Sequence, residues 1–338
     1  MTTNTLLSAQ PHTGGTHEMA VRTEGLIKDF GELRAVDNVD LEVRTGEIFG
    51  VLGPNGAGKT TTLRMLATLL SIDGGQAEVF GVDVARQPHV VRQLLGVTGQ
   101  YASVDENLTA TENLVLFGRL QGVGRARART VAADLLAEFG LEDAAKRPIS
   151  EFSGGMRRRL DLAASLITRP PLIFLDEPTT GLDPRTRGQM YQTIRSLVAD
   201  GCTVLLTTQY LDEADQLADR IAVIDEGRKV AEGTPDELKT SVGNSTLQVQ
   251  LTDPAELTTA AEQIHRQLAV APVLNRLNGQ LNVALESADQ AGDVLIALRT
   301  RGVSVASVNV SKPSLDEVFL ALTGHGASAD PTTAKDPR

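Results

Sequence analysis

The sequence predicts an α/β domain with a mostly parallel sheet, followed by a small α+β domain. Three observations predict this: short apolar runs alternate with helical stretches, a glycine-rich loop follows one such run, and the order of elements changes after residue 243. Continuous apolar strands are buried on both faces, as in a parallel sheet covered by helices. With 338 residues, of which 41% are hydrophobic, the chain is long enough for both domains.

The β pattern of the first domain begins at Ala20. Alternation of apolar and polar residues at 39–43 predicts a half-buried strand, and the apolar run at 48–52 predicts a buried one. Further buried strands are expected at 172–175, 204–206 and 221–224, with helices at 185–200 and 210–218 between them. We therefore expect a mostly parallel sheet that is covered on both faces.

The strand pattern stops between about residues 104 and 166. Thr109 is followed three residues later by Glu112, and this capping box predicts the start of a helix. Residues 125–139 have an apolar period of 3.6 residues, which predicts a second helix. We expect a helical insertion inside the α/β domain.

The order of elements after residue 243 predicts the second domain. Strands are expected at 246–251, 272–277, 281–285 and 303–310, helices at 254–268 and 290–301, and a turn at Asn278-Gly279. This β-α-β-β-α-β order is that of the ferredoxin-like fold. The expected boundaries are 20–240 for the first domain, a linker near 241–245, 243–324 for the second domain, and disordered tails at 1–19 and 325–338.

A last helix is expected at 314–322. Its apolar residues have i, i+3, i+4, i+7 spacing, at Leu315, Val318, Phe319 and Leu322. By periodicity alone, this is a docking helix for the small domain.

Composition limits the classes of function. The net charge of −11 and the pI near 5.0 argue against extensive wrapping of nucleic acid, so no nucleic-acid partner is expected. No apolar stretch approaches the roughly 20 residues of a membrane helix, and the first 20 residues lack the apolar block of a signal peptide. We expect a soluble chain that would act at a membrane only as a peripheral subunit. The single cysteine, Cys202, is expected to be a buried structural thiol.

A phosphate-binding loop is expected directly after the strand at 48–52. The loop fits the pattern G-x-x-x-x-G-K-[ST] and consists of Gly53, Pro54, Asn55, Gly56, Ala57, Gly58, Lys59, Thr60 and Thr61. Glycines let backbone N–H groups surround phosphates, and the N-terminus of the following helix adds positive potential. Lys59 is expected to reach the β- and γ-phosphate oxygens, and Thr60 to hold Mg²⁺. The loop predicts that the chain binds Mg·ATP.

Two carboxylates end the strand expected at 172–175. Asp176 suits a magnesium site, and Glu177 can orient or deprotonate an attacking water. Because neighbouring residues at a strand end project to different sides, one residue can serve each purpose. A strand that ends in acidic residues is common. The pair therefore predicts a catalytic site only because a phosphate loop is also present.

A third motif lies about twenty residues before this pair. Ser153-Gly154-Gly155-Met156 resembles the signature motif of the ATP-binding cassette (ABC) superfamily, and the resemblance extends from about residue 20 to 237. It implies a RecA-like P-loop ATPase core with an antiparallel β subdomain. It also implies roles in nucleotide binding for Gln100, which would contact the metal as well, for Phe30, whose ring would stack on adenine, and for Asp183 in the Gly181-Leu182-Asp183 loop.

The signature motif also has a physical interpretation. Ser153 and the two glycines open a helix, so a hydroxyl and bare N–H groups form an anion site. A simple helix cap would leave Gly154 and Gly155 unexplained, since glycine weakens a helix start unless the backbone must approach something closely. The family resemblance implies that this is the γ-phosphate bound to a second copy, in a head-to-tail dimer that encloses two ATP molecules.

A run of three arginines, 157–159, follows the signature motif. Within the resemblance it could line the nucleotide cleft or meet a partner. A solvated helix face is at least as good an interpretation. We assign the run no catalytic role.

Gln209 departs from the common pattern of the superfamily. Most ABC ATPases have a histidine after this strand, and none of the five histidines of this chain is near it in sequence. A glutamine amide can donate to the γ-phosphate, but it does not titrate near neutral pH. We expect slow hydrolysis that is insensitive to histidine titration, with Glu177, Lys59 and Gln209 as its catalytic residues.

The amino-acid sequence around Gln209 is similar to that of one subgroup of the superfamily. The segments 207–215 and 152–159 and the terminal Leu315-Asp316-Glu317-Val318-Phe319-Leu320 resemble the daunorubicin/doxorubicin-resistance type of drug-exporter ATPase. The resemblance implies an ATPase that powers a separate membrane permease for drugs, antibiotics or lipids, bound to the cytoplasmic face of the plasma membrane. An importer ATPase, and a soluble ABC ATPase acting on ribosomes or DNA, remain the alternatives. The latter usually has paired cassettes, whereas this chain has one phosphate loop and one signature motif.

Overall fold

The predicted buried strands form the central sheet of the first domain. The computed structural model describes residues 18–99, 104–242, 245–275, 279–287, 289–311 and 313–323. The central sheet has the order β10-β9-β3-β8-β7-β6. Its strands are β3 (Ile48–Leu52), β6 (Leu95–Thr98), β7 (Leu172–Asp176), β8 (Thr203–Thr208), β9 (Arg220–Asp225) and β10 (Arg228–Gly233). All neighbours are parallel except β9 and β10.

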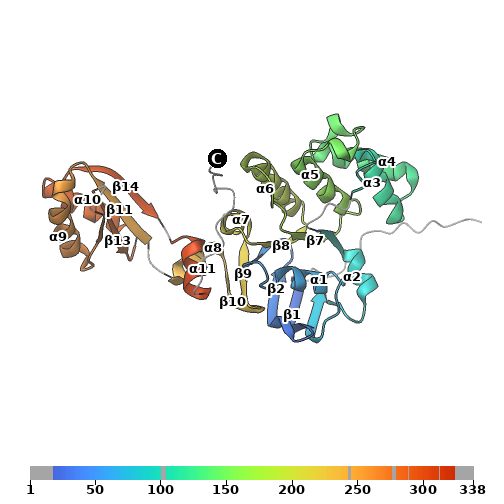
Figure 1. Ribbon diagram of the computed structural model, residues 1–338, viewed down its shortest axis with the longest axis horizontal. Helices are drawn as coiled ribbons and strands as arrows, with labels where there is room; N and C mark the ends of the chain where they lie inside the picture. Colours follow the sequence, from blue (N-terminus) through green and yellow to red (C-terminus); the bar gives the residue numbers. More distant parts are fainter. Residues whose placement is uncertain are drawn as a thin grey trace, which may run out of the picture.

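Both faces of this sheet are covered, as the continuous apolar runs predict. Along β7, Phe174 packs into one apolar cluster, whereas Ile173 and Leu175 pack into another on the opposite face. The first cluster contains α1 (Lys59–Leu66) and an antiparallel sheet of order β2-β1-β4-β5. That sheet consists of β1 (Met19–Phe30), β2 (Leu33–Arg44), β4 (Gly74–Val79) and β5 (Val82–Asp83), and α2 (Pro88–Leu94) follows it. Figure 1 shows α1 between the two sheets, so the phosphate loop opens between two rigid layers.

The helical insertion is present where the strand pattern stops. It contains α3 (Ala110–Leu120), α4 (Arg125–Glu138), two short 3-10 turns and α5 (Gly154–Ser165). The predicted capping box begins α3: the Glu112 amide donates to Thr109 Oγ1 (3.2 Å), and the Thr109 amide donates to Glu112 Oε2 (2.9 Å).

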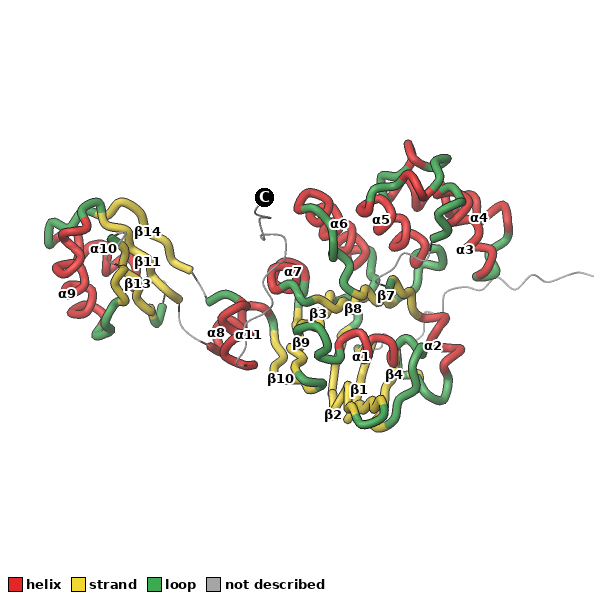
Figure 2. Tube along the Cα trace, in the orientation of Figure 1, coloured by secondary structure: helices red, strands yellow, loops and turns green. Residues whose placement is uncertain are grey.

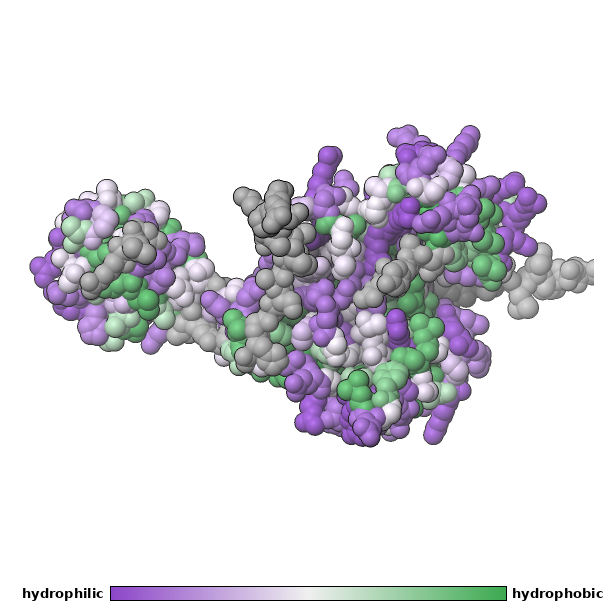
Figure 3. Space-filling view, in the orientation of Figure 1, coloured by the Kyte–Doolittle hydropathy of each residue, from purple (hydrophilic) through white to green (hydrophobic). Residues whose placement is uncertain are grey.

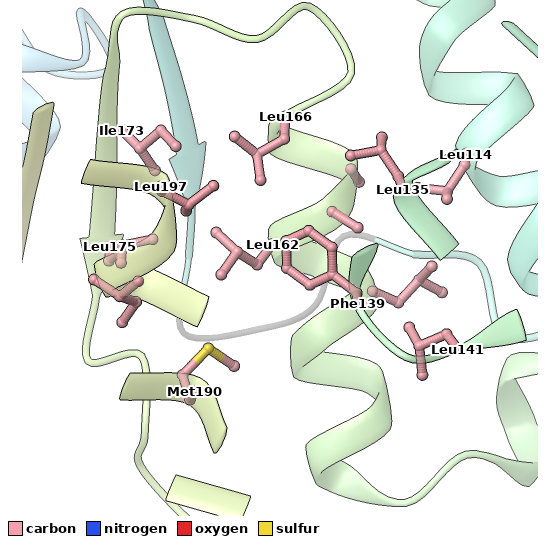
Figure 4. Close-up of a cluster of buried hydrophobic side chains, with 14 of the residues drawn as sticks. Leu114, Leu135, Phe139, Leu141, Leu162, Leu166, Ile173, Leu175, Met190 and Leu197 are labelled. Carbon is pink, nitrogen blue, oxygen red and sulfur yellow. The ribbon is translucent and has the colours of Figure 1, made fainter. Parts of the chain in front are cut away.

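Helix α5 joins this insertion to the sheet. Leu162 and Leu166, in and just after α5, lie between the side chains of α3 and α4 and those of β7 and α6 (Pro184–Ala199), as Figure 4 shows. The helix that carries the signature motif is therefore packed against the strand that carries Asp176.

The small domain has the predicted ferredoxin-like order. Its sheet, β12-β13-β11-β14, is antiparallel throughout. Its elements are β11 (Ser245–Leu251), α9 (Leu257–Leu268), β12 (Val273–Asn275), β13 (Gln280–Leu285), α10 (Gln290–Thr300) and β14 (Val305–Ser311). Val249, Ile264 and Leu298 bring the sheet and both helices into one core.

Helices α8 (Pro235–Val242) and α11 (Leu315–Thr323) connect the small domain to the first domain. Figures 1 and 2 show them side by side between the two bodies. In the space-filling view of the same face, both bodies carry many hydrophilic residues on their surfaces (Figure 3). Three of the four apolar residues predicted for the last helix are buried: Leu315, Val318 and Phe319 pack with Leu238 of α8 and with α7 (Leu211–Leu217). The expectation was wrong for Leu322, which is 36% exposed, and the helix docks on the first domain and not on the small one. Helix α11 thus returns to the first domain after the small domain is complete.

A few expected boundaries differ from the structure. Strand β1 begins at Met19, inside the expected N-terminal tail. Pro254 opens a 3-10 turn, and the α-helix starts only at Leu257. Residues 1–17 and 325–338 of the expected tails, and Asn278 of the expected turn, lie outside the described residues. Within the described ranges, no helix has the length and apolar character needed to cross a membrane.

Candidate functional site

The predicted phosphate loop connects β3 to α1. Gly58 has a φ of +101°, and a Cβ there would lie 2.4 Å from the Ala35 carbonyl oxygen, so a side chain would collide with the backbone. Helix α1 has no acidic residue in its first turn and no side-chain cap. Its first N–H groups therefore suit an anionic ligand, and the loop fits a bound phosphate chain.

Lys59 lies under this loop and is only 4% exposed. Its ammonium group donates to the carbonyl oxygens of Gly53 (2.7 Å) and Pro54 (2.8 Å). Burial lowers the pKa of Lys59, and the nearby carboxylates of Glu177 and Asp176 oppose that shift. These two carboxylates help to keep the lysine cationic, which is the state that attracts phosphate oxygens.

Asp176 and Thr60 meet beside Lys59, although 116 residues separate them in sequence. The Thr60 hydroxyl donates to Asp176 Oδ1 at 2.9 Å, and the Thr207 hydroxyl donates to the same oxygen at 2.6 Å. Asp176 is 3% exposed. A hydroxyl and a carboxylate so placed are the oxygen ligands that Mg²⁺ prefers, so the donor set fits this metal.

Glu177 has an unusual backbone conformation directly after β7. Its φ is +49°, which is uncommon for a residue with a Cβ and is found where the surrounding structure enforces it. Its amide donates to the Thr207 carbonyl at 3.1 Å, and Thr180 Oγ1 donates to Glu177 Oε2 at 3.2 Å. The two adjacent carboxylates thus have different hydroxyl partners, Thr60 and Thr207 for Asp176 and Thr180 for Glu177.

The other expected nucleotide contacts lie around this centre. Phe30 ends β1, is 47% exposed, and its ring centroid lies 5.4 Å from Lys28 Nζ. Gln209 is half-buried and follows β8, whose Thr207 pairs with Asp176. Gln100 lies outside the described residues. The adenine, metal and switch roles of these three residues stay predictions.

The signature motif opens α5, with Ser153 as its cap. Ser153 Oγ accepts from the Met156 amide at 3.3 Å, and both Ser153 and Gly154 are exposed. The two glycines differ: a Cβ at Gly154 would meet nothing within 4 Å, whereas one at Gly155 would lie 2.3 Å from Thr186 Cγ2. A contact within the chain therefore explains Gly155, in addition to any contact with a second copy.

Asp183 caps α6 on the other side of that contact. Its Oδ1 accepts from the amides of Arg185 (3.1 Å) and Thr186 (3.0 Å), and its Oδ2 accepts from the Thr186 hydroxyl at 2.6 Å. The Thr186 hydrogen bonds keep the pKa of Asp183 below its usual value. Asp183 thus fixes the side chain against which Gly155 packs.

The three arginines at 157–159 do not form a solvated helix face, because each is partly buried. Arg157 pairs with Glu106 at 2.6 Å, and Arg159 donates to the Phe139 carbonyl at 3.1 Å. Arg158 is directed towards the site: it donates to the carbonyl oxygens of Asp176 (2.8 Å), Glu177 (2.8 Å), Pro178 (3.0 Å) and Gly99. Burial lowers its pKa, but an arginine remains charged. Arg158 thus joins the signature helix to the residues on either side of Glu177.

The sequence motifs do not indicate three further residues of the site, which are Arg158, Thr207 and Glu213. Arg158 stands in a run of three identical residues, so nothing in the sequence separates it from its neighbours. Thr207 belongs to an apolar strand. For Glu213 a signal existed, because α7 carries apolar residues at Leu211, Ala214 and Leu217, and a carboxylate on that side is buried.

A phosphate loop, paired carboxylates and a serine-glycine helix start on one α/β core define an ATP-binding cassette. Comparisons with known proteins agree. The ABC transporter family profile matches residues 36–180, and the profile of the DrrA1-3-like ATP-binding protein C-terminal domain matches residues 233–323.

Two curated relatives match nearly the whole chain. The daunorubicin/doxorubicin resistance ATP-binding protein DrrA of Streptomyces peucetius is 55% identical, covering 91% of this chain and 93% of that protein. The doxorubicin resistance ATP-binding protein DrrA of Mycobacterium tuberculosis H37Rv is 42% identical, covering 93% and 95%. The chain belongs to the DrrA type of ABC transporter ATP-binding proteins.

One solved structure relates the first domain to a dimer. A dimeric ATP-binding cassette in a post-hydrolysis state, bound to ADP and Pi, has a TM-score of 0.58 and 27% identity. It covers 63% of this chain and 98% of that one. Membership of this family makes the chain an ATP-binding subunit with an ATPase core.

Proposed function

We propose that this chain is the ATPase subunit of an ABC exporter and that its own residues hold Mg·ATP for hydrolysis. The observation that carries the proposal is the junction of Thr60 with Asp176 at 2.9 Å, beside the buried Lys59. This junction unites the phosphate loop with the acidic end of β7. It supports Thr60 and Asp176 as metal ligands. Gln100 is proposed as a further ligand from the family resemblance alone.

The residues divide the chemistry between them. Lys59 and the amides of the loop balance the charge of the phosphate oxygens, and Phe30 offers its exposed ring to the adenine. Glu177 accepts the proton of a water that attacks the γ-phosphorus, while the bond to the ADP oxygen breaks. The Gln209 amide donates to the γ-phosphate. When bound, Mg²⁺ would supply charge neutralisation at the β- and γ-phosphates.

A second copy completes this site. Ser153 and Gly154 are exposed, and Gly154 has open space in front of it, so both can face a phosphate held by another chain. The dimeric cassette with a similar fold supports this arrangement. Two copies, head to tail, then enclose two ATP molecules between phosphate loops and signature motifs.

The transported cargo follows from the relatives. Their names record resistance to daunorubicin and doxorubicin, so we propose that the chain drives export of such drugs. The chain would act at the cytoplasmic face of the membrane, on a separate permease. No observation favours an importer or a ribosome-bound ATPase.

Activity of the purified chain tests the first part. We expect Mg-dependent release of phosphate from ATP, and loss of both ATP binding and turnover in Lys59→Ala. The exposed Lys146 offers a matched control, because Lys146→Ala removes the same charge away from the site. Equal turnover of wild type and Lys59→Ala would contradict the proposal.

Recovery from cells tests the second part. Tagged chain should be recovered with membrane fractions and with one integral membrane protein, and the pair should raise resistance to daunorubicin. Glu177→Gln in the pair should remove the resistance. Recovery of the tagged chain with ribosomes instead would contradict the exporter proposal.

A further inference from the structure

A buried carboxyl group lies behind the proposed catalytic glutamate and has no assigned role. Glu213 is in the first turn of α7 and is 0% exposed. Its Oε1 accepts a hydrogen bond of 2.8 Å from the hydroxyl of Thr179, which is also fully buried. Its Oε2 is buried and has no hydrogen-bond partner among the described residues, although the Thr208 hydroxyl is near.

The hydrogen bond between Thr179 and Glu213 joins two segments that each carry a proposed catalytic residue. Thr179 comes two residues after Glu177, in the segment that leads to Asp183 and α6. Glu213 comes four residues after Gln209, on the helix that follows β8. The hydrogen bond between Thr179 and Glu213 thus connects the loop after Glu177, the proposed base, to α7, the helix that follows Gln209.

We propose that Glu213 is a positioning residue for ATP hydrolysis: through Thr179, it fixes the loop after Glu177 against the helix after Gln209. The inference rests on the proposed function, because it assigns Glu213 a task only if Glu177 and Gln209 act on ATP. Glu213 does not itself touch nucleotide. It adds one buried side-chain contact to the pairing of β7 with β8, to the hydrogen bond from the Glu177 amide to the Thr207 carbonyl oxygen, and to the stacking of Arg187 on Tyr210.

Burial and the surrounding charges together set the protonation state of Glu213. Glu177 repels a charge on Glu213, Arg187 of α6 attracts it, and Tyr191 of α6 and Arg158 of α5 complete the surroundings. The helix N-terminus also favours a charge. Burial nevertheless dominates and raises the pKa of Glu213, with the Thr208 and Thr179 hydroxyls in partial opposition.

Arg158 does not neutralise Glu213 directly, because its guanidinium group donates to four backbone carbonyl oxygens. Both protonation states can pair with Thr208: protonated Oε2 can donate towards its hydroxyl, and a carboxylate oxygen can accept from it. Because Oε2 is buried without a hydrogen bond of normal geometry, the cost of burying a charge there favours the neutral acid. The neutral form additionally leaves the charge of Glu177 undisturbed.

Substitutions that separate length from charge test this proposal. Glu213→Gln keeps the length, the acceptor for Thr179 and a donor for Thr208, so we expect kcat within about twofold of wild type. Glu213→Asp keeps the acid but is one methylene shorter, and Glu213→Ala has no acceptor. In both, kcat should fall by roughly 10- to 100-fold with little change in KM for ATP, because misplaced catalytic groups slow chemistry more than binding.

The partner of the hydrogen bond provides a second pair of variants. Thr179→Ser keeps the hydroxyl and should retain kcat, whereas Thr179→Val should match Glu213→Ala. The double variant Glu213→Ala with Thr179→Val should be no slower than either single variant, since both remove one contact. This pair keeps the test valid if Glu213→Ala does not fold.

Stability against pH gives a readout that does not depend on activity. The native state holds a proton on Glu213 that the unfolded state loses above its ordinary pKa, so this group's contribution to stability falls as pH rises through the raised native pKa. Relative to Glu213→Gln, wild type should therefore lose thermal stability from about pH 4.5 upwards. If the thermal stabilities of wild type and Glu213→Gln change in parallel with pH, Glu213 is not neutral in the native state.

The outcomes distinguish this inference from the proposed function. If wild type hydrolyses ATP and Glu177→Gln stops it, but folded Glu213→Ala and Thr179→Val turn over at the wild-type rate, the positioning role is wrong. A fall in kcat matched by an equal loss of folded protein would also overturn it. If wild type itself hydrolyses no ATP, both ideas fail together.

Discussion

Gln209 lies one residue beyond β8, whose Thr207 pairs with Asp176. An amide at this position can donate a hydrogen bond to a γ-phosphate oxygen but cannot exchange a proton near neutral pH. Turnover of the wild type should therefore show no inflection near the usual histidine pKa of about 6.5.

Two substitutions test this residue. Gln209→Ala should lower kcat because a donor to the γ-phosphate is lost, and Gln209→His should introduce a pH dependence of kcat centred near pH 6.5. Steady-state phosphate release between pH 5.5 and 8.5 measures both. Unchanged turnover in Gln209→Ala would remove Gln209 from the mechanism.

Arg158 makes a second prediction at the scale of one side chain. Its planar guanidinium group reaches four backbone carbonyl oxygens, whereas lysine has one ammonium group that cannot span them. Arg158→Lys should lower kcat by roughly 10- to 100-fold, because Glu177 loses part of its support.

The neighbouring Arg157 provides the control for this prediction. It pairs with Glu106, at the surface, and Arg157→Lys should leave kcat nearly unchanged. Equal rates for the two lysine variants would show that the carbonyl contacts of Arg158 are irrelevant to turnover.

At the scale of elements, α5 and α6 meet where Gly155 faces Thr186. A Cβ at Gly155 would lie 2.3 Å from Thr186 Cγ2, and such overpacking costs about 1–3 kcal/mol. Gly155→Ala should thus lower the free energy of unfolding, and Thr186→Ser should restore it, since serine lacks Cγ2 but keeps the hydroxyl that binds Asp183. Chemical denaturation measures each variant.

Gly154→Ala separates packing from catalysis. Because nothing lies within 4 Å of a Cβ at Gly154, this variant should be as stable as wild type. Its ATPase rate should nevertheless fall if a second copy presents phosphate there. Wild-type turnover in Gly154→Ala would argue against the shared site.

Helix α11 gives another prediction at this scale. Phe319 is 3% exposed in the apolar cluster with α7 and α8, so Phe319→Ala should cost about 3–5 kcal/mol of stability if the two bodies unfold together. Leu320 is 48% exposed on the same helix, and Leu320→Ala should change stability little. Thermal unfolding of both variants checks the contrast.

These elements show what the sequence could and could not predict. The strands of the central sheet and the phosphate loop are local patterns, because burial on both faces and phosphate binding each constrain consecutive residues. The contacts of Arg158 reach Gly99 and Glu177, far apart in sequence, and no periodicity records them. The apolar face of α11 was predictable from its spacing, but not its packing against α7 and α8.

At the scale of the molecule, the small domain is inserted between α8 and α11. Its first and last strands are neighbours, since Thr246 of β11 pairs with Ser311 of β14. Replacing residues 245–311 by a short Gly/Ser linker should therefore leave the first domain folded, with α11 still in place. Truncation after residue 242 should be less stable, because it removes α11 from the apolar cluster that contains Leu238.

Thermal midpoints of the two shortened proteins decide between these expectations. Comparable midpoints would mean that α11 contributes nothing to the first domain. Dimerisation and ATPase rate of the excised protein, at equal stability, then report on the small domain alone. An unchanged rate with weaker dimerisation would indicate a bracing role.

The pairing of β11 with β14 also limits how the small domain can move. The small domain is connected to the rest of the chain at both of its ends, through α8 before β11 and through α11 after β14, and these two strands are neighbours in one sheet. Because β11 and β14 are hydrogen-bonded to each other, the two ends of the domain cannot separate without breaking their sheet. A displacement of the small domain would therefore act on α8 and α11 together, and α11 packs against α7, the helix that follows Gln209.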